Sequence, residues 1–237
     1  MKMNNNQQYM EREAYGIDPQ YINQCSGASA TSQLFNCAKQ VHYEPQQNIF
    51  QEGRAADTVF LILKGMVKLI SYLPNGNARI VRLLGPGNIL GLEAIVDDTY
   101  EHSAMAIHDI QMLKIPSTTL RRIKNREPEK FFLLGEQWYE YLRAADTWIT
   151  QFSTGSITAR VARLVTFLAY IETETAPDHV ELLKVDEMAA VLGVTPESVS
   201  RVLARFKRQQ ALKRTGTHNE YHYIRDSNML EEYALDQ

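Results

Sequence analysis

The chain has 237 residues, of which 44% are hydrophobic, 22% charged and 9% aromatic. This composition is typical of one large or two modest globular domains and excludes a disordered or fibrous protein. Its 25 Lys and Arg nearly balance its 28 Asp and Glu, which leaves a formal net charge of −3. That balance excludes a uniformly cationic surface that coats a nucleic acid, so any contact with DNA must come from a local patch.

The N-terminal residues 1–35 are polar and predict a flexible arm. They contain no apolar segment of the kind found in a signal peptide. The longest apolar runs of the chain, such as Val59 to Leu63, are far shorter than the roughly 18 residues that indicate a membrane-spanning helix. We therefore expect a cytoplasmic protein without membrane contact. The two cysteines, Cys25 and Cys37, are expected to be free thiols in a reducing compartment, with a redox switch between them as the alternative.

Residues 36–127 carry the pattern of a β-domain. Short runs of β-forming residues between Val41 and Ile115 are separated by glycines, with turn sequences at residues 74–77 and 85–87. Short strands with glycine-marked turns at this spacing predict a barrel, a sandwich or a jelly roll. The pattern becomes helical near Pro116, so an α+β fold is predicted for the whole chain.

Residues 128–154 predict one long helix between the two halves of the chain. Apolar residues recur there at alternating steps of three and four, which is the pattern of a coiled-coil seam, and a second apolar stripe widens the same face. We expect this helix to pair with its copy in a homodimer; burial inside its own domain is the alternative. Gly155 follows and predicts a hinge. The predicted dimer interface consists of Phe131, Leu134, Trp138, Tyr141, Leu142, Ala145, Trp148, Ile149 and Phe152.

The strongest motif lies in residues 155–237, where residues 185–203 have the layout of a helix-turn-helix. Gly193 permits a tight turn between the two helices, and Thr195 followed by Pro196 predicts the cap and the first residue of the second helix. An amphipathic helix precedes the motif, and an alternating pattern after it predicts a β-hairpin wing. We therefore predict a winged helix-turn-helix that binds DNA.

The second helix of this motif carries side chains that can read base edges. Arg201 can make a bidentate contact to the O6 and N7 atoms of guanine, Glu197 can accept a hydrogen bond from a cytosine N4 amino group, and Ser200 is short enough to approach a neighbouring base. Cations on the wing are expected to contact phosphates. The predicted DNA-binding residues are Thr195, Glu197, Ser200, Arg201, Arg205, Lys213 and Arg214.

These features in this order, with the segment Glu197–Ser198–Val199–Ser200–Arg201, resemble the CRP/FNR family of bacterial transcription regulators over about residues 38–230. The resemblance implies an N-terminal β-roll of the cyclic-nucleotide-binding jelly-roll type, a long dimerisation helix and a C-terminal winged helix-turn-helix. The Glu-x-x-Ser-Arg pattern is closer to the FNR branch and implies a TTGAT-like half-site in a palindrome. Pro196 stands where the cyclic-AMP branch has an arginine, so one DNA contact of that branch is missing.

The resemblance also implies a contact with RNA polymerase, as in transcription activators. The family's surfaces for this contact correspond to the loop at residues 177–179 and to the turn at Asn75–Gly76. Both loops are consistent with activation.

Residues 91–104 resemble the phosphate-binding cassette of the family. There an acidic residue holds the ribose and an arginine neutralises the cyclic phosphate, but Leu92 and His102 stand at these positions here. Only Ser103 matches, so we do not expect cyclic AMP as the effector. Glu93 and His102 can serve another polar ligand. The predicted effector pocket consists of Leu92, Glu93, His102, Ser103, Tyr141 and Ala145.

Other sensor chemistries are limited by the available ligands. Two cysteines cannot supply the four ligands of an iron–sulfur cluster, so such a cluster is not expected. Haem-based gas sensing stays an alternative, although a lone histidine in a β-domain is more often a packed or surface side chain. A regulator without effector, controlled by its abundance, is a further alternative. The candidate axial ligands of a haem are His42, His102, His108, Cys25 and Cys37.

An enzyme is the main competing class, because β-rolls are close in architecture to cupins, which hold a metal with histidines and a carboxylate. The required pair of close histidines is missing: His102 and His108 are six residues apart, which spans about 20 Å on a strand. The sequence has no nucleophile-elbow, Walker or dinucleotide-binding glycine motif. We therefore expect neither catalysis nor a metal site.

Overall fold

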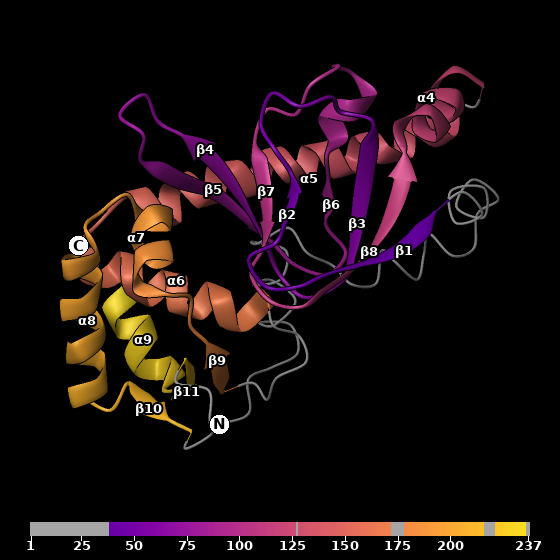
Figure 1. The fold of residues 1–237 in the computed structure, drawn as a ribbon. Coiled ribbons are helices and arrows are strands. Elements are labelled where there is room, and N and C mark those ends of the chain that lie inside the picture. The colour runs from indigo at the N-terminus through magenta and orange to yellow at the C-terminus, as the bar shows by residue number, and fades with distance from the viewer. Residues whose placement is uncertain (1–37, 127, 172–177, 216–220, 236–237) are drawn as a thin grey trace. The chain divides into compact units, whose positions relative to one another are not determined.

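The computed structural model describes residues 38–126, 128–171, 178–215 and 221–235, without the side chains of residues 129–141. The chain forms two compact units. The first contains the described residues up to Ser71 together with Val81–Ala145, and the second contains Tyr72–Ile80 together with the described residues from Asp146 onward, so one boundary lies within the long helix α5 (Pro128–Ser153). The first unit is built mainly of strands and the second mainly of helices (Figure 1). The predicted α+β fold is confirmed.

The β-domain consists of two antiparallel four-stranded sheets (Figure 1). A 3-10 turn, η1, lies between β6 and β7, and helix α4 follows the last strand. In spatial order the first sheet contains β1 (Lys39–Tyr43), β8 (Ile110–Pro116), β3 (Thr58–Lys64) and β6 (Ile89–Leu90); the second contains β2 (Asn48–Phe50), β7 (Ser103–Ala106), β4 (Val67–Tyr72) and β5 (Ala78–Leu84); η1 spans Leu92–Ile95 and α4 spans Ser117–Arg126.

The alternation of apolar and polar residues on these strands places the core between the sheets. On β8, Ile110 and Met112 are fully buried, whereas Gln111 and Lys114 are exposed. Ile62 on β3 is the register partner of Met112 and is also fully buried. Successive side chains on a strand point to opposite faces, so one face of each sheet covers the core and the other meets solvent.

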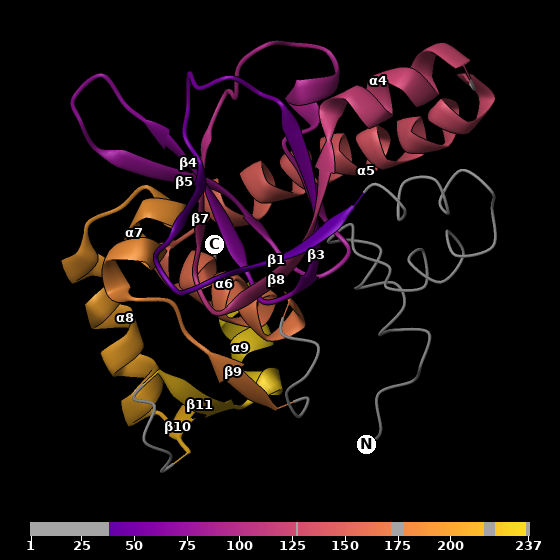
Figure 2. The same ribbon diagram turned by 45° about the vertical axis from the view of Figure 1, so that its right-hand side comes forward.

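The C-terminal domain packs its helices around α6 (Ile157–Ile171), which contacts α7, α8, α9 and β9. Leu164 and Leu168 on α6 are fully buried. A small antiparallel sheet, in the order β10-β11-β9, lies against one end of α8 in both views (Figures 1 and 2). The remaining elements are β9 (His179–Glu181), α7 (Val185–Leu192), α8 (Pro196–Arg208), β10 (Leu212–Arg214), β11 (His222–Arg225) and α9 (Ser227–Ala234).

The turn between α5 and α6 contains Gly155, whose φ angle is +83°. Glycine adopts this left-handed backbone without the steric penalty that a Cβ atom brings. The helix break therefore occurs where the sequence predicts it. None of the helices in the described ranges is long and apolar enough to cross a membrane. The predicted N-terminal arm lies outside the described residues.

Candidate nucleic-acid interface

Helices α7 and α8 pack through small and branched apolar side chains. Ala189 and Val191 on α7 are buried, as is Val199 on α8. Gly193, with a φ angle of +63°, ends α7, and its N–H donates to the Ala189 carbonyl oxygen at 2.8 Å. The predicted helix-turn-helix is confirmed, with the glycine at the turn.

The start of α8 differs in one detail from the expected cap. Thr195 has extended backbone angles and Pro196 begins the helix, as predicted. The Thr195 hydroxyl, however, does not accept a hydrogen bond from the helix backbone; its oxygen lies 3.2 Å from the Ser198 hydroxyl. The Ser198 N–H donates instead to the Thr195 carbonyl oxygen at 3.1 Å. The backbone therefore provides the acceptor for this N–H, and the Thr195 hydroxyl is available to interact with side chains.

One side of α8 is exposed and polar, and the opposite side is buried. Glu197, Ser200 and Arg201 are exposed, whereas Val199 and Phe206 are fully buried. The Arg201 Nε–H donates to the backbone carbonyl oxygen of Glu197 at 3.3 Å. The Glu197 pKa lies below its ordinary value because its own backbone N–H and the Thr195 hydroxyl donate to the carboxylate, with a smaller contribution from the charge of Arg201. This side of α8 therefore presents an ionised acceptor and a guanidinium donor together.

The wing is formed by β10 and β11, as the alternation predicts, and β9 extends it to a three-stranded sheet. Lys213 and Arg214 on β10 are exposed. The Lys207 ammonium lies 4.7 Å from the ring centre of Tyr223 on β11, a cation–π contact that joins α8 to the wing. The two cations of β10 are thus held on a strand that contacts α8.

The segment that resembles a phosphate-binding cassette keeps a tightly packed frame. Gly91 has a φ angle of +78°, and a Cβ atom there would lie 2.7 Å from the Thr58 carbonyl oxygen. Tyr100 stacks on Phe50 with ring centres 3.9 Å apart, and its hydroxyl donates to the Thr58 carbonyl oxygen at 2.8 Å. Burial of this side chain raises the Tyr100 pKa to about 12. The frame therefore requires a glycine and a buried tyrosine.

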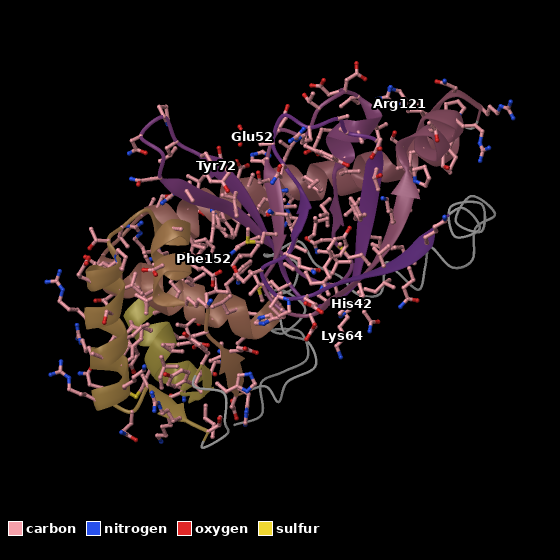
Figure 3. All side chains as sticks on the ribbon, viewed as in Figure 1. His42, Glu52, Lys64, Tyr72, Arg121 and Phe152 are labelled. Atoms are coloured by element: carbon pink, nitrogen blue, oxygen red, sulfur yellow. The ribbon has the colours of Figure 1, made fainter. Side chains whose placement is uncertain are left out.

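The polar groups around this frame do not fit a cyclic phosphate. Residues 91–103 contain four carboxylates and neither Lys nor Arg. The Ser103 hydroxyl accepts the Glu52 N–H at 3.1 Å. The Arg121 guanidinium from α4 donates to the carbonyl oxygens of Ala94 at 3.0 Å and Asp97 at 2.9 Å, so it holds the loop itself (Figure 3). The carboxylates of this segment would repel an anionic phosphate, and the segment contains no guanidinium that could neutralise it.

The other residues of the predicted effector pocket are only partly placed. Leu92 and Glu93 lie on η1 and His102 directly precedes β7; all three are half-buried, as is Ala145 on α5. The Tyr141 side chain lies outside the described residues.

The candidate haem ligands are only partly placed. His42 is exposed and its Nε2 lies 3.3 Å from a carboxylate oxygen of Asp109. His102 and His108 are half-buried, and Cys25 and Cys37 lie outside the described residues. Within the described ranges no group of three His, Cys, Asp or Glu side chains is arranged to hold a metal ion.

The predicted seam of α5 divides into exposed and buried residues. Leu142 and Ile149 are 67% and 59% exposed. Phe152, labelled in Figure 3, is 2% exposed. It is buried because it packs edge-on against Trp148 and Phe167 inside the C-terminal domain. Phe152 is therefore a core residue of its own domain, as in the alternative given for this helix, rather than a residue exposed for contact with a partner helix. The side chains of Phe131, Leu134, Trp138 and Tyr141 lie outside the described set.

Two family profiles match the chain in this order. The profile of the cyclic nucleotide-binding domain matches residues 40–127, and that of the Crp-like helix-turn-helix domain matches residues 159–233. The chain belongs to the CRP/FNR family. Proteins of this family are DNA-binding transcription regulators and not enzymes, which confirms both of these predictions.

Individual CRP/FNR proteins resemble the chain over most of its length. The transcriptional activatory protein AadR of Rhodopseudomonas palustris is 27% identical over 180 residues, which cover 74% of each chain. The cAMP-activated global transcriptional regulator Vfr of Pseudomonas aeruginosa is 26% identical over 183 residues, which cover 74% of this chain and 85% of Vfr. The structure of FixK2 from Bradyrhizobium japonicum superposes with a TM-score of 0.72 at 21% identity, covering 84% of this chain and 98% of FixK2.

The contacts at the C-terminal end of α8 in this CRP/FNR domain were not predicted from the sequence. There the Arg205 Nε–H and the Tyr233 hydroxyl both donate to the Gln209 side-chain oxygen, at 3.1 Å and 2.6 Å. Tyr233 belongs to α9, which the sequence analysis did not predict. A signal was present, because Asp226 precedes this helix and its carboxylate accepts the Met229 N–H at 3.1 Å, as an N-cap does.

Proposed function

We propose that the chain acts as a homodimer that regulates transcription by binding a TTGAT-like inverted repeat in the cytoplasm. In this proposal residues 36–127 form the sensor domain, residues 128–154 the dimerisation helix and residues 155–237 the DNA-binding domain. Arg201, Glu197 and Ser200 contact base edges. The other residues predicted to contact DNA lie at or near the phosphate backbone in this proposal. They are Thr195, Arg205, Lys213 and Arg214.

The observation that carries this proposal is the exposed polar side of α8. Positions 197 and 201 are one helical turn apart, and Ser200 lies beside them on the same side. Buried Val199 and Phe206 hold the opposite side against the domain. A helix fixed in this way can enter the major groove with its three polar side chains facing the bases.

The two exposed apolar residues of α5 support the dimer. Leu142 and Ile149 are one heptad apart, so they lie on the same face of the helix. Exposed large apolar side chains at heptad spacing are buried when two copies of the helix pair. Two copies related by a two-fold axis present two recognition helices, which suits a palindromic site.

The sensor domain supports an effector other than cyclic AMP. Vfr is described as cAMP-activated, but the cassette of this chain lacks the guanidinium and holds four carboxylates. A neutral or cationic polar ligand near Glu93 and His102 suits these charges better. A haem, a redox signal through Cys25 and Cys37, and control by abundance alone are the alternatives. Contact with RNA polymerase would use the loop at residues 177–179 and the turn at Asn75–Gly76.

The test is fluorescence anisotropy of the full-length protein at physiological salt, on a TTGAT inverted repeat and on a scrambled duplex. Specific binding is expected to be at least about 10³-fold tighter than binding to the scrambled duplex. Arg201→Ala is expected to cost about 1–3 kcal/mol on the repeat and to abolish the preference for guanine at its position. Arg122→Ala, which removes an exposed arginine of α4, is the control for charge and is expected to retain this preference.

Two results contradict the proposal. Equal affinity of the wild-type protein for both duplexes, with and without added cell extract, contradicts the half-site. An unchanged guanine preference in Arg201→Ala contradicts the role of this side chain.

A further inference from the structure

Helix α9 connects two other parts of the C-terminal domain through adjacent residues near its end. It begins after the cap residue Asp226 and packs on α6, with Leu230 fully buried. Tyr233 faces the recognition helix α8, and the carbonyl oxygen of Ala234 faces α6. The two attachments are therefore one residue apart on the same helix.

The first attachment fixes the C-terminal half of α8. The Tyr233 ring stacks on Phe206, with centres 4.8 Å apart and planes at 18°. The Arg205 guanidinium lies 5.3 Å from the centre of the same ring. The Tyr233 hydroxyl and the Arg205 Nε–H share the Gln209 side-chain oxygen as acceptor. Arg205 is thus held by a ring face and by a hydrogen bond, although its side chain is exposed.

The second attachment fixes the turn after α5. The Arg163 guanidinium on α6 donates twice to the Ala234 carbonyl oxygen, at 3.0 Å and 2.8 Å. It also donates to the carbonyl oxygens of Gln151 at 3.2 Å and Thr154 at 2.9 Å. The last carbonyls of a helix have no partner within it, and a cation is favoured at that end. Arg163 therefore satisfies the ends of α5 and α9 together.

We propose that α9 couples the turn after α5 to the recognition helix, with Tyr233 and Arg163 as positioning residues that act on DNA through Arg205. The inference rests on the proposed DNA binding, and it assigns a role in that binding to α9, which is not part of the helix-turn-helix. An arginine held before binding loses less side-chain entropy when it contacts a phosphate. A change at the end of α5 reaches Arg205 through Arg163, Ala234 and Tyr233.

A double-mutant cycle in the full-length protein tests this coupling. Tyr233→Leu removes the ring and the hydroxyl and is expected to weaken DNA binding about three- to tenfold, because one to two contacts of ordinary strength are lost. It is also expected to reduce the salt dependence of the binding constant by about the contribution of one phosphate contact. Tyr233→Phe, which keeps the stack, should restore part of the affinity. In an Arg205→Ala background Tyr233→Leu should have no further effect, because its target is absent.

Arg163→Met tests the second attachment, since it keeps the aliphatic stem and removes all four donated hydrogen bonds. It is expected to weaken DNA binding in the wild-type background and to have a smaller effect when Arg205 is already alanine. Asn228→Ala, an exposed position of α9, is the matched control and should leave affinity unchanged. Circular dichroism at the temperature of the binding assay verifies that each variant is folded.

The coupling is overturned if Tyr233→Leu binds DNA like the wild type, or if its effect adds fully to that of Arg205→Ala. Because a phosphate contact does not depend on base sequence, the cycle is measured on the scrambled duplex as well. An incorrect half-site then abolishes the preference between duplexes while leaving the cycle intact, so the two proposals fail in different ways.

Discussion

The β-domain and the C-terminal domain retain different parts of their family pattern. In the C-terminal domain both the buried frame and the exposed polar side chains that we propose to contact DNA are present: Val199 and Phe206 are buried, and Glu197 and Arg201 are exposed. In the β-domain the cassette keeps its frame, but Leu92 stands at the position that holds the ribose in the family and His102 at the position that neutralises the cyclic phosphate. The residues that pack the cassette can therefore be retained while the residues that bind its ligand change.

The physical reason for this difference lies in which residues each task uses. The cassette frame depends on buried contacts, such as the stack of Tyr100 on Phe50, and their loss destabilises the domain. Ligand contacts depend on side chains that are partly exposed, and these can change at little cost in folding free energy.

The largest effect is expected at α5, which contributes to both domains. Ile149→Glu places a charge on the exposed apolar face, and we expect the dimer to dissociate and DNA affinity to fall about 10²–10⁴-fold, because the two half-sites are no longer bound together. Multi-angle light scattering measures the mass, and anisotropy measures the affinity. Thr150→Glu adds the same charge at the next residue, outside both apolar stripes, and is the control. A dimer that persists in Ile149→Glu contradicts the interface.

In the cassette frame, Tyr100→Ala is expected to reduce the free energy of unfolding by roughly 3–5 kcal/mol, since a large buried ring is removed. Tyr100→Phe keeps the stack and loses only the hydrogen bond to Thr58, for a cost of about 1 kcal/mol. Urea unfolding measures both. If Tyr100→Ala lowers the free energy of unfolding by less than Tyr100→Phe does, the tightly packed frame is contradicted.

The raised pKa of Tyr100 gives the same site a pH dependence. The folded state favours the neutral phenol, so the unfolded chain loses this proton at lower pH than the folded chain does. The contribution of Tyr100 to the free energy of unfolding is fully present below pH 10 and is lost as the pH rises toward about 12. Tyr100→Phe should remove this part of the alkaline loss, and an identical alkaline profile in the variant contradicts the assignment.

A smaller effect is expected when the ligand chemistry of the cassette is rebuilt. Leu92→Glu combined with His102→Arg introduces the acidic residue and the guanidinium of the family, and should raise cyclic AMP affinity at least about tenfold through charge-assisted hydrogen bonds. Calorimetry measures the affinity. Leu92→Gln with His102→Gln controls for side-chain size without charge. Micromolar binding by the wild-type protein contradicts the exclusion of cyclic AMP.

The smallest effect is expected at Glu197 on α8. Thr195→Val removes a hydroxyl that donates to the carboxylate, so the Glu197 pKa should rise toward its ordinary value. The carboxylate of the wild type therefore remains an acceptor at lower pH than that of the variant. A carbon-13 NMR titration of the Glu197 carboxyl measures the difference, with Ser200→Ala as the control. An unchanged titration contradicts the contact with Thr195.

The sequence predicted the elements that have strong local signals. The glycine turn at Gly193 and the Thr195–Pro196 helix start need no distant partner, because backbone conformation and capping are decided within a few residues. The break at Gly155 was predicted for the same reason. The exposed side of α8 was predicted because helical periodicity separates its apolar positions from its polar ones.

Other features could not be predicted from local pattern. Phe152 continues the heptad seam in sequence, yet Phe167 and Trp148 bury it in its own domain. The short strand β9 has three residues and forms only because β11 provides its partner. A periodic pattern shows which side chains need burial but does not identify what buries them.

Local sequence patterns were therefore sufficient to predict the order of the β-domain, the long helix and the winged helix-turn-helix. They were also sufficient to show that Leu92 and His102 replace the family's ribose and phosphate ligands. The contacts of Arg163 with the ends of α5 and α9, and of Tyr233 with Arg205, could be identified only in the folded chain. The physical reason is the range of the interactions. Turns, caps and amphipathic faces arise between near neighbours, whereas these contacts join Arg163 and Arg205 to a helix that follows much later in the chain.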